Sequence, residues 1–252
     1  MFLRLVQVKI RPDTSARIPK LYAERIMQPL RKTTGCLFAG LIQSVGSSGE
    51  AFSMTLWDTA EHAEAYERSG LFRELLKAAE PYIFDSSEWK IQLSEDLKLE
   101  YAPVGEEAVV RSYRVAAASD DRPPDAADAD RLYVRLLSIK LQPGKREEFV
   151  KIYNSEILPA LGTVKDCRYA FLTEGIGDES GVVSLTIWNN KEAADAYESG
   201  GLFAGLMDKI RHTLSGLYRW KMAVETSSDL KVHTSDDVQV TGYNVVKGET
   251  FH

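Results

Sequence analysis

The chain has 252 residues, 44% of them hydrophobic, a length that can bury one large core or two cores of ordinary domain size. Its net charge of −6, with Lys and Arg scattered along the chain, argues against nucleic acid or an anionic membrane as partner. Two cysteines provide no disulfide framework, and no apolar run approaches the roughly 20 residues of a membrane helix. We therefore expect a soluble, cytoplasmic protein.

The first half of the chain predicts strands and helices in the order βαββαβ. The segment 3–10 (LRLVQVKI) alternates in polarity as a strand does, and apolar residues at helical spacing follow between Ile18 and Leu30. Two further strands, 36–44 and 52–57, flank a loop rich in Gly and Ser. A second helix should then start with Asp58 as N-cap and Glu61 at N3, and WKIQL (89–93) is expected as the fourth strand.

The second half repeats this order at a constant shift of 131 positions. WDTAEHAEAYERSGLF (57–72) falls on WNNKEAADAYESGGLF (188–203), and LRLVQVKIRP (3–12) falls on VRLLSIKLQP (134–143). The equivalent cap is Asn189 with Glu192, and the equivalent fourth strand is WKMAV (220–224). A duplicated domain follows from this match.

The domain boundaries are set by the ends of the match and by composition. An extra C-terminal strand is expected in each copy, at 111–115 and 241–245, and the segment 116–130 is rich in Pro, Asp and Ala, as a solvated linker is. We therefore predict a first repeat over 1–115, a linker over 116–130 and a second repeat over 131–252.

The fold class expected from this order is α+β, with two ferredoxin-like repeats. A four-stranded sheet with both helices on one face leaves the other face open to water. Two such sheets can close on each other, and the linker is long enough to let both copies of one chain do so. We expect an intramolecular dimeric α/β barrel in which the repeats pair with each other, with a homodimer of whole chains left open.

The repeated motif, with a strand ending in Trp, a capped turn, an Ala-rich helix and then Gly-Leu-Phe, resembles the antibiotic biosynthesis monooxygenase (ABM) domain of the dimeric α/β-barrel superfamily. The resemblance covers 2–94 and 133–225. It implies the barrel fold and, in some branches, oxygen chemistry. The superfamily also includes members with no known reaction, so the fold does not fix the function.

The branches of that family differ in their polar residues. For the branch that oxidises polyketide anthrones, the resemblance implies an Asn where this chain has Ser53 and Ser184, and a Tyr where it has Ala63 and Ala194. Tyr66 and Tyr197 stand about one helical turn further on. For the haem-degrading branch it implies a His ligand where this chain has Leu76 and Met207, which disfavours haem.

Several residues are candidates for a site, each with a structural alternative. Trp57 and Trp188 could stack an aromatic substrate or be core residues, and Ser53 and Ser184 could orient a ligand or be ordinary polar residues on the same strand face. Tyr66 and Tyr197 could donate a hydrogen bond as catalytic residues or pack on the sheet. Phe72 and Phe203, in the same motif, complete the set that we expect to contact substrate.

Other residues received less weight. Arg4 and Lys9, with their equivalents Arg135 and Lys140, lie on opposite faces of the first strand, so only one pair can point into the barrel. Cys36 and Cys167 are expected as small buried residues. The four His do not coincide between copies and show no metal-ligand spacing, and no glycine-rich phosphate loop follows a strand, so neither metal nor cofactor is expected.

We interpret the chain as a cofactor-independent monooxygenase that acts on a small aromatic substrate, such as a quinol or anthrone, in the barrel cavity. The alternative is a non-catalytic protein of the same fold that binds a small ligand or a partner. The two differ in whether the barrel encloses several hundred cubic ångströms or is filled by side chains. A third alternative is a site in only one copy, since the copies differ at Gly40/Phe171 and His62/Ala193.

Overall fold

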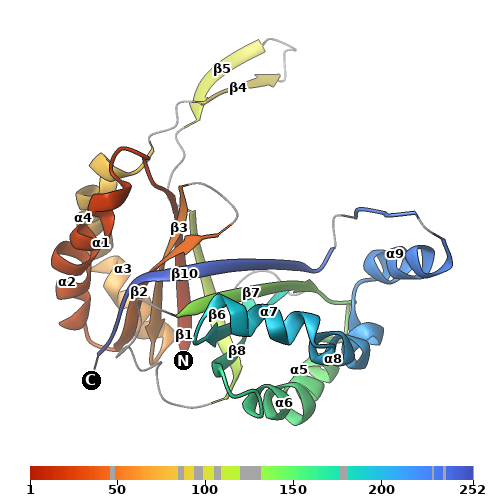
Figure 1. The fold of residues 1–252 in the computed structure, drawn as a ribbon. Helices are drawn as coiled ribbons and strands as arrows, with labels where there is room; N and C mark the ends of the chain where they lie inside the picture. The colour runs from red at the N-terminus through yellow and green to blue at the C-terminus, as the bar shows by residue number, and fades with distance from the viewer. Residues whose placement is uncertain are drawn as a thin grey trace.

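We describe the chain from a computed structural model that covers residues 1–45, 49–84, 88–93, 99–104, 109–119, 132–175, 181–228, 230–234 and 237–251. Its main feature is a closed antiparallel barrel with the strand order β1-β3-β2-β10-β7-β9-β8-β6 (Figure 1). The first repeat provides β1 (Phe2–Lys9), β2 (Cys36–Ser44), β3 (Glu50–Trp57) and β6 (Val109–Ala118). The second provides β7 (Tyr133–Lys140), β8 (Cys167–Gly175), β9 (Gly181–Trp188) and β10 (Gln239–Thr250). The predicted intramolecular α/β barrel is thereby confirmed.

The two halves join through the last strand of each repeat. β6 pairs with β1 of its own repeat and with β8 of the other, while β10 pairs with β7 of its own repeat and with β2 of the other. Each half therefore has the strand order 4-1-3-2 of a ferredoxin-like sheet. Because every strand edge is paired, the barrel leaves no open edge of the kind that promotes aggregation.

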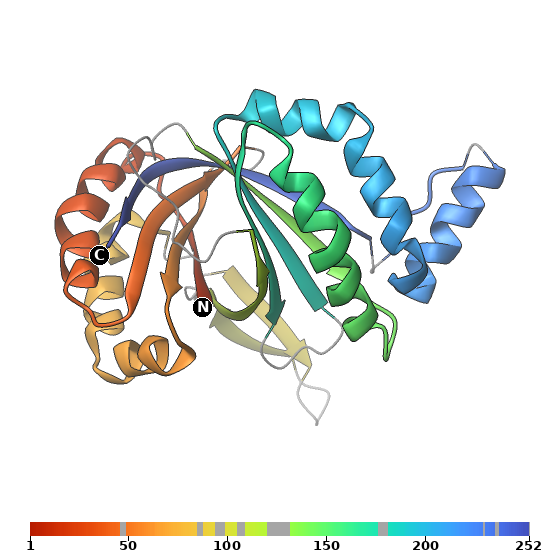
Figure 2. The same cartoon turned by 90° about the horizontal axis from the view of Figure 1, so that it is seen from below.

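The helices cover the outside of the barrel, one set on each half (Figure 2). In the first repeat a long helix is made of α1 (Ile18–Leu21), a π-helical stretch (Tyr22–Met27) and α2 (Gln28–Arg31), followed later by α3 (Ala60–Arg68) and α4 (Leu71–Ala79). The second repeat matches it with α5 (Arg146–Ile152), a π-helical stretch (Tyr153–Ile157) and α6 (Leu158–Gly162), then α7 (Lys191–Ser199) and α8 (Leu202–Ile210). The duplicated order of elements is as predicted.

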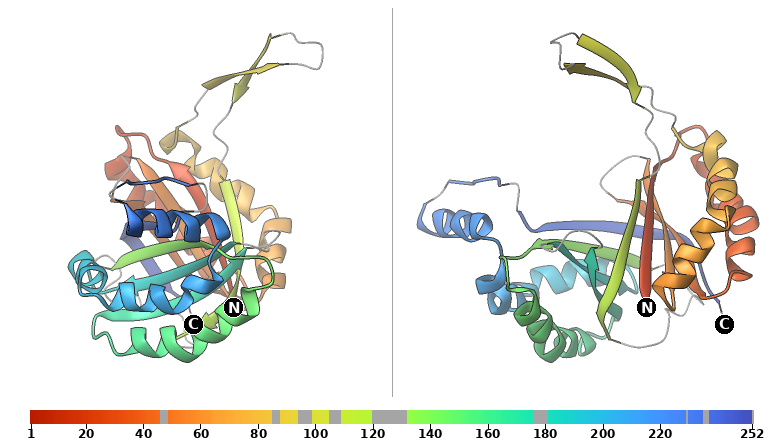
Figure 3. Two further views of the ribbon diagram at one scale, coloured as in Figure 1. Left: turned by 90° about the vertical axis from the view of Figure 1, so that its right-hand side faces the viewer. Right: turned by 180° about the vertical axis from the view of Figure 1, so that it is seen from behind.

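The predicted fourth strands are wrong in both repeats. WKIQL lies in β4 (Glu88–Leu93), which pairs only with β5 (Leu99–Val104) in a hairpin that projects from the barrel (Figure 3). WKMAV lies in α9 (Gly216–Ser227), a helix whose first turn is capped when the Ser215 side chain accepts from the Tyr218 amide. The strands expected as extra C-terminal ones, β6 and β10, are the true fourth strands.

Two smaller corrections concern element ends. The helix caps lie one residue later than predicted, at Thr59 and Asn190, whose side chains accept from the backbone amides three residues on. β6 runs to Ala118, so residues 116–118 belong to a strand and not to the linker. The predicted linker residues 120–130 lie outside the described residues.

The inside of the barrel is filled with side chains. Alternation along each strand places Leu3 and Leu5 of β1 inside, together with Met54 and Leu56 of β3 and their counterparts from the second half. The free space left among them is about 10 Å³, less than one water molecule needs. This space is far too small for the substrate that we expected to find in the barrel. Within the described residues, no helix has the length and apolar character needed to cross a membrane.

Candidate functional site

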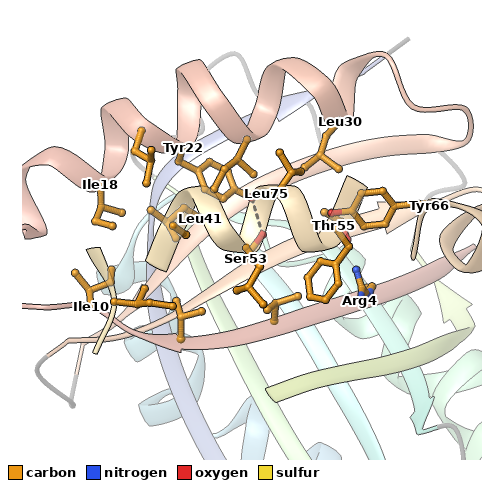
Figure 4. Close-up of a pocket in the computed structure, with 18 residues that line it drawn as sticks. Arg4, Ile10, Ile18, Tyr22, Leu30, Leu41, Ser53, Thr55, Tyr66 and Leu75 are labelled. Carbon is orange, nitrogen blue, oxygen red and sulfur yellow. Dashed lines mark hydrogen bonds between the residues drawn. The ribbon is translucent and has the colours of Figure 1, made fainter. Parts of the chain in front are cut away.

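A pocket lies on the outer face of the first half of the barrel, beneath the helices of the first repeat (Figure 4). The space open to the centres of water molecules inside it is about 70 Å³, far less than an ordinary drug-sized site provides, but the pocket opens to solvent, so a ligand held there would extend out of it. Its floor is formed by β1 and β3, and its walls by the helix that contains Ile18 and Tyr22 and by α4 with Leu75. Most of the lining is aliphatic.

Strand alternation explains which polar groups reach this pocket. Ser53 and Thr55 are on the outer face of β3, between residues that point into the barrel. The Tyr22 and Ser53 hydroxyls are 2.9 Å apart and hydrogen-bonded to each other, and the Trp57 indole nitrogen donates to Thr55 Oγ1 at 3.0 Å. The prediction that the Ser and the Trp share one strand face is confirmed, but that face points at the helices.

The repeated sequence motif builds one end of the pocket. The Tyr66 ring lies against Trp57 with centroids 5.0 Å apart, and Phe72 follows at 6.1 Å from Tyr66. Gly70 joins α3 to α4 with φ of +84°, a conformation that favours glycine, and so sets where α4 begins and where Phe72 lies. The motif thus brings three rings into contact in order, from the buried Trp57 outward to Phe72, with the first pair tilted and the second edge-to-face.

A buried cation lies at the same end. The Arg4 side chain on β1 is only 2% exposed, and its guanidinium carbon is 4.1 Å from the Phe72 ring centroid and 5.4 Å from that of Tyr66. Burial lowers the pKa of the Arg4 guanidinium, but arginine stays charged in proteins. Arg4 therefore adds a fixed positive charge to an otherwise apolar pocket.

The two phenols that line the pocket, Tyr66 and Tyr22, are neutral at physiological pH. Burial raises the pKa of Tyr66 to about 12, against which the Arg4 charge acts only partly, and burial raises the pKa of Tyr22 as well. Burial also raises the pKa of the Cys36 thiol to about 12, in line with its prediction as a small buried residue. The two phenols can donate hydrogen bonds, and neither is a base near pH 7.

The second repeat makes the same contacts. Tyr153 and Ser184 are hydrogen-bonded at 2.8 Å, Trp188 donates to Thr186 at 2.8 Å, and Trp188 lies 5.0 Å from Tyr197. Tyr197 in turn lies 5.8 Å from Phe203. These contacts alone do not make a pocket, because in both repeats they belong to the packing between helix and sheet.

The space is what differs between the repeats. Four lining residues of the first repeat, Val6, Val8, Ile18 and Ala79, correspond to larger residues at the shift of 131: Leu137, Ile139, Phe149 and Ile210. All four larger side chains are buried in one continuous core, with Phe149 fully inaccessible and Ile210 2% exposed. In the second repeat these larger side chains take up space that their smaller counterparts leave open in the first.

The predicted site residues thus fall into groups. Tyr66, Phe72 and Ser53 line the pocket, whereas Trp57 is completely buried behind Tyr66 and is not among the lining residues. Ser184, Trp188, Tyr197 and Phe203 lie in the filled core of the second repeat or against it. Their roles in binding or catalysis stay predictions.

Sequence reasoning gave too little weight to two residues. The sequence predicts Tyr22 only as part of a helix, and Arg4 only as one of two charged residues on the first strand, yet both line the pocket. Their identity with Tyr153 and Arg135 at the shift of 131 was the available signal. Lys9 lies away from the pocket, with its ammonium 5.6 Å from the exposed Phe84 ring. No group of three or more His, Cys, Asp or Glu side chains suited to a metal ion occurs in the described part of the chain.

The fold and its site define the class of protein. Two ferredoxin-like halves that share one closed barrel, each with helices outside and a Trp-Tyr-Phe stack beneath them, constitute a dimeric α/β barrel within one chain. The antibiotic biosynthesis monooxygenase family matches residues 1–78 and 132–209. The chain belongs to this family, as a tandem repeat of its domain.

Solved structures share the fold at low sequence identity. Two proteins, each described as a "putative monooxygenase", from Fusobacterium nucleatum and Lactobacillus acidophilus, both give a TM-score of 0.67 at 10% and 8% identity. They cover 99% of this chain, and 94% and 95% of their own chains are covered. An anthrone oxidase-like protein gives 0.57 at 13% identity, covering 99% of this chain and 92% of its own. No curated protein shows significant sequence similarity. These likenesses concern the fold.

Proposed function

We propose that the first repeat binds a small aromatic molecule of the quinol or anthrone type in its outer pocket and oxidises it with O2, as a cofactor-independent monooxygenase. The observation that carries the proposal is the pocket itself, where apolar walls meet a cluster of polar groups at one end, namely Arg4, Tyr66 and Thr55. Family membership and the shared fold of the anthrone oxidase-like protein support it.

The substrate itself supplies the electrons for this reaction, so the protein needs only to bind it and stabilise its ionised form. An ionised quinol or anthrone is electron-rich and can itself reduce O2: the CH2 group of an anthrone and O2 become a carbonyl group and water, and a quinol with an unsubstituted ring carbon and O2 become a hydroxyquinone and water. The protein would hold the ring away from water and stabilise the negative charge on its oxygen. Tyr66, neutral up to a pH of about 12, would donate a hydrogen bond to that oxygen.

The lack of a base among the residues that line the pocket restricts which substrates can ionise there. Among the residues that line the pocket none can accept a proton near pH 7, because the lining consists of aliphatic and aromatic residues, Ser53, Thr55 and the cation Arg4. The substrate must therefore ionise by giving its proton to water. This requirement favours acidic phenols and their relatives over weakly acidic hydrocarbons.

The non-catalytic alternative is favoured by one observation. The Ser53 and Tyr22 hydroxyls are already bonded to each other, which leaves them with less capacity to orient a reacting group. A pocket with this lining would serve equally to carry a small ligand without changing it.

Oxygen uptake separates the two functions. We would incubate the protein with anthrone and with hydroquinones in air, follow O2 with an electrode and the quinone by absorbance, and use 18O2 to count the oxygen atoms incorporated. The control is the Val6→Leu/Ala79→Ile variant, which introduces the larger residues of the second repeat without touching Arg4 or Tyr66. We expect one oxygen atom in the product and loss of uptake in the variant. Saturable binding with oxidation only at the background rate would establish the non-catalytic function.

A further inference from the structure

We infer that the ligand of the first-repeat pocket is an organic anion, an apolar ring or chain that presents a carboxylate or phenolate oxygen to Arg4. The inference rests on the proposed function in using the same pocket, and it names the chemical class that the pocket selects. It applies whether the bound molecule is then oxidised or only carried.

The first argument is the unsatisfied hydrogen-bonding capacity of Arg4. Its Nε and Nη2 atoms are buried, and within the described residues no group accepts a hydrogen bond from either of them. The nearest carboxylate oxygen, Oε2 of Glu67, lies 3.4 Å from Nη2, on a side chain that is 56% exposed. A buried charge with open donors is costly, and an incoming oxyanion would remove that cost.

The aromatic neighbours do not supply the missing acceptors. Phe72 and Tyr66 lie over the guanidinium group, with centroids at 4.1 and 5.4 Å. The Tyr66 side chain hydrogen-bonds to the Arg4 side chain, but not at Nε or Nη2, and the Phe72 ring has no oxygen or nitrogen that could accept from them. This arrangement holds the Arg4 fork in one orientation, which suits recognition of a planar carboxylate or a phenolate.

The rest of the pocket sets what the anion is attached to. Arg4 is the one charged side chain among the lining residues, and Figure 4 shows it at one end with Thr55 and Tyr66, while Ile10 and Ile18 lie at the other. A ligand that fills this space must be charged at one end and apolar at the other. Free inorganic anions would leave the aliphatic end empty, and neutral hydrocarbons would leave Arg4 unpaired.

The second repeat provides an internal comparison. Arg135, the equivalent of Arg4, donates from Nε to Oε2 of Glu198 at 3.4 Å, and its Nη2 lies 3.3 Å from the same oxygen. Glu198 is itself the equivalent of Glu67. Nη2 is a buried donor without an acceptor in both arginines, so the two differ at Nε, which donates to Glu198 in the second repeat and is unpaired in the first. The open pocket thus coincides with one further unpaired donor, Nε of Arg4.

The test compares two probes of the same size, 2-naphthoate and the neutral 2-naphthalenemethanol, by isothermal titration calorimetry at pH 7.5. We expect wild-type protein to bind the carboxylate about 10- to 100-fold more tightly, the range for charge-assisted hydrogen bonds. Arg4→Gln should remove this preference and leave the affinity for the alcohol unchanged, and Arg4→Lys should keep part of it. Arg135→Gln is the matched control and should keep all of it.

The outcomes separate this inference from the proposed function. If both probes bind wild-type protein equally, or if Arg4→Gln keeps the preference, the inference is wrong although the pocket stands. If neither probe binds, both the pocket as a ligand site and the role of Arg4 are refuted. Should Arg4→Gln fail to fold, the wild-type comparison and Arg4→Lys still decide.

Discussion

Filling the first-repeat pocket with the residues of the second repeat should stabilise the protein and abolish ligand binding. The change is Val6→Leu with Ala79→Ile, which copies Leu137 and Ile210 onto the equivalent positions. Both positions line the pocket, and neither substitution introduces a polar group or alters Arg4. Stability and binding should therefore change in opposite directions.

The magnitude follows from the size of the pocket. At about 24 cal/mol per Å³, a fully enclosed cavity of about 70 Å³ would lower the stability by about 2 kcal/mol, which is the upper bound for this pocket because it opens to solvent. The four added carbons would contribute about 3 kcal/mol if fully buried, at about 0.8 kcal/mol each, but Ala79 is partly exposed. We expect a gain of about 1–2 kcal/mol, which for a chain of this length raises Tm by roughly 2–8 °C.

Differential scanning calorimetry and titration with 2-naphthoate would measure the two effects on the same samples. The matched control is the reverse exchange in the second repeat, Leu137→Val with Ile210→Ala, which should cost about 2–5 kcal/mol by opening a cavity in a filled core. A filled variant that loses 1 kcal/mol or more, or that binds the probe as wild type does, would refute the reasoning, because the space would then not be a ligand pocket.

Three further predictions concern single groups. Tyr22→Phe or Ser53→Ala alone should cost about 1–3 kcal/mol in urea unfolding by leaving one buried hydroxyl unpaired, whereas the double variant should cost less than the sum of the two. The pKa of Tyr66 is about 12 in the folded protein, whereas an unfolded tyrosine ionises near pH 10, so the contribution of Tyr66 to the free energy of unfolding is complete below pH 10 and lost between pH 10 and 12. Urea unfolding followed by circular dichroism at pH 8 and 11 should therefore show a smaller loss of stability with pH in Tyr66→Phe than in wild type. An equal loss in both proteins would contradict this. Gly70→Ala and Gly201→Ala should each lower the free energy of unfolding by about 1–2 kcal/mol because of the positive φ at these positions. A clash does not contribute, because an added Cβ would meet nothing within 4 Å. Only Gly70→Ala should also weaken 2-naphthoate binding, because Gly70 sets the position of Phe72 in the pocket.

Most of the fold could be predicted because it repeats. The alternation of 3–10 and the helical spacing after it recur in 134–141 and beyond, and two independent copies of one pattern agree on strand, helix and order. The closed barrel followed from the open face that each four-stranded sheet would leave. These inferences depend on periodicity, which the sequence displays directly.

The fourth strands failed because local similarity was taken for a shared structure. WKIQL and WKMAV align at the shift of 131, yet the first is in a hairpin strand and the second in a helix. In the second copy Ser215 caps a helix start, and Met222 and Ala223 favour the helix. The strands that close each sheet come later, and only long-range pairing with β1 and β7 identifies them.

The candidate site was predicted in its residues but not in its location. Alternation placed Ser53 on the same face as Trp57, which is correct, but it could not say which face of the sheet encloses free space, because both faces are apolar and covered. The position of a pocket depends on the volumes of side chains from several elements. Conservative differences such as Val6 against Leu137 determine whether space is left, but they do not change the hydrophobic pattern from which the elements were predicted.

The same differences explain why a matching motif is poor evidence for two sites. The Trp-Tyr-Phe stack and the Tyr-Ser hydrogen bond are present in both repeats, so they satisfy the packing of helix on sheet wherever it occurs. An unfilled pocket of this size lowers stability by at most about 2 kcal/mol, a large share of the 5–15 kcal/mol typical of a folded protein. Duplication allows one copy to carry that cost while the other, with larger core side chains and Nε of Arg135 paired with Glu198, stabilises the barrel that both share. The feature to compare among tandem chains of this family is therefore the set of side chains around the pocket and the pairing of the buried arginine.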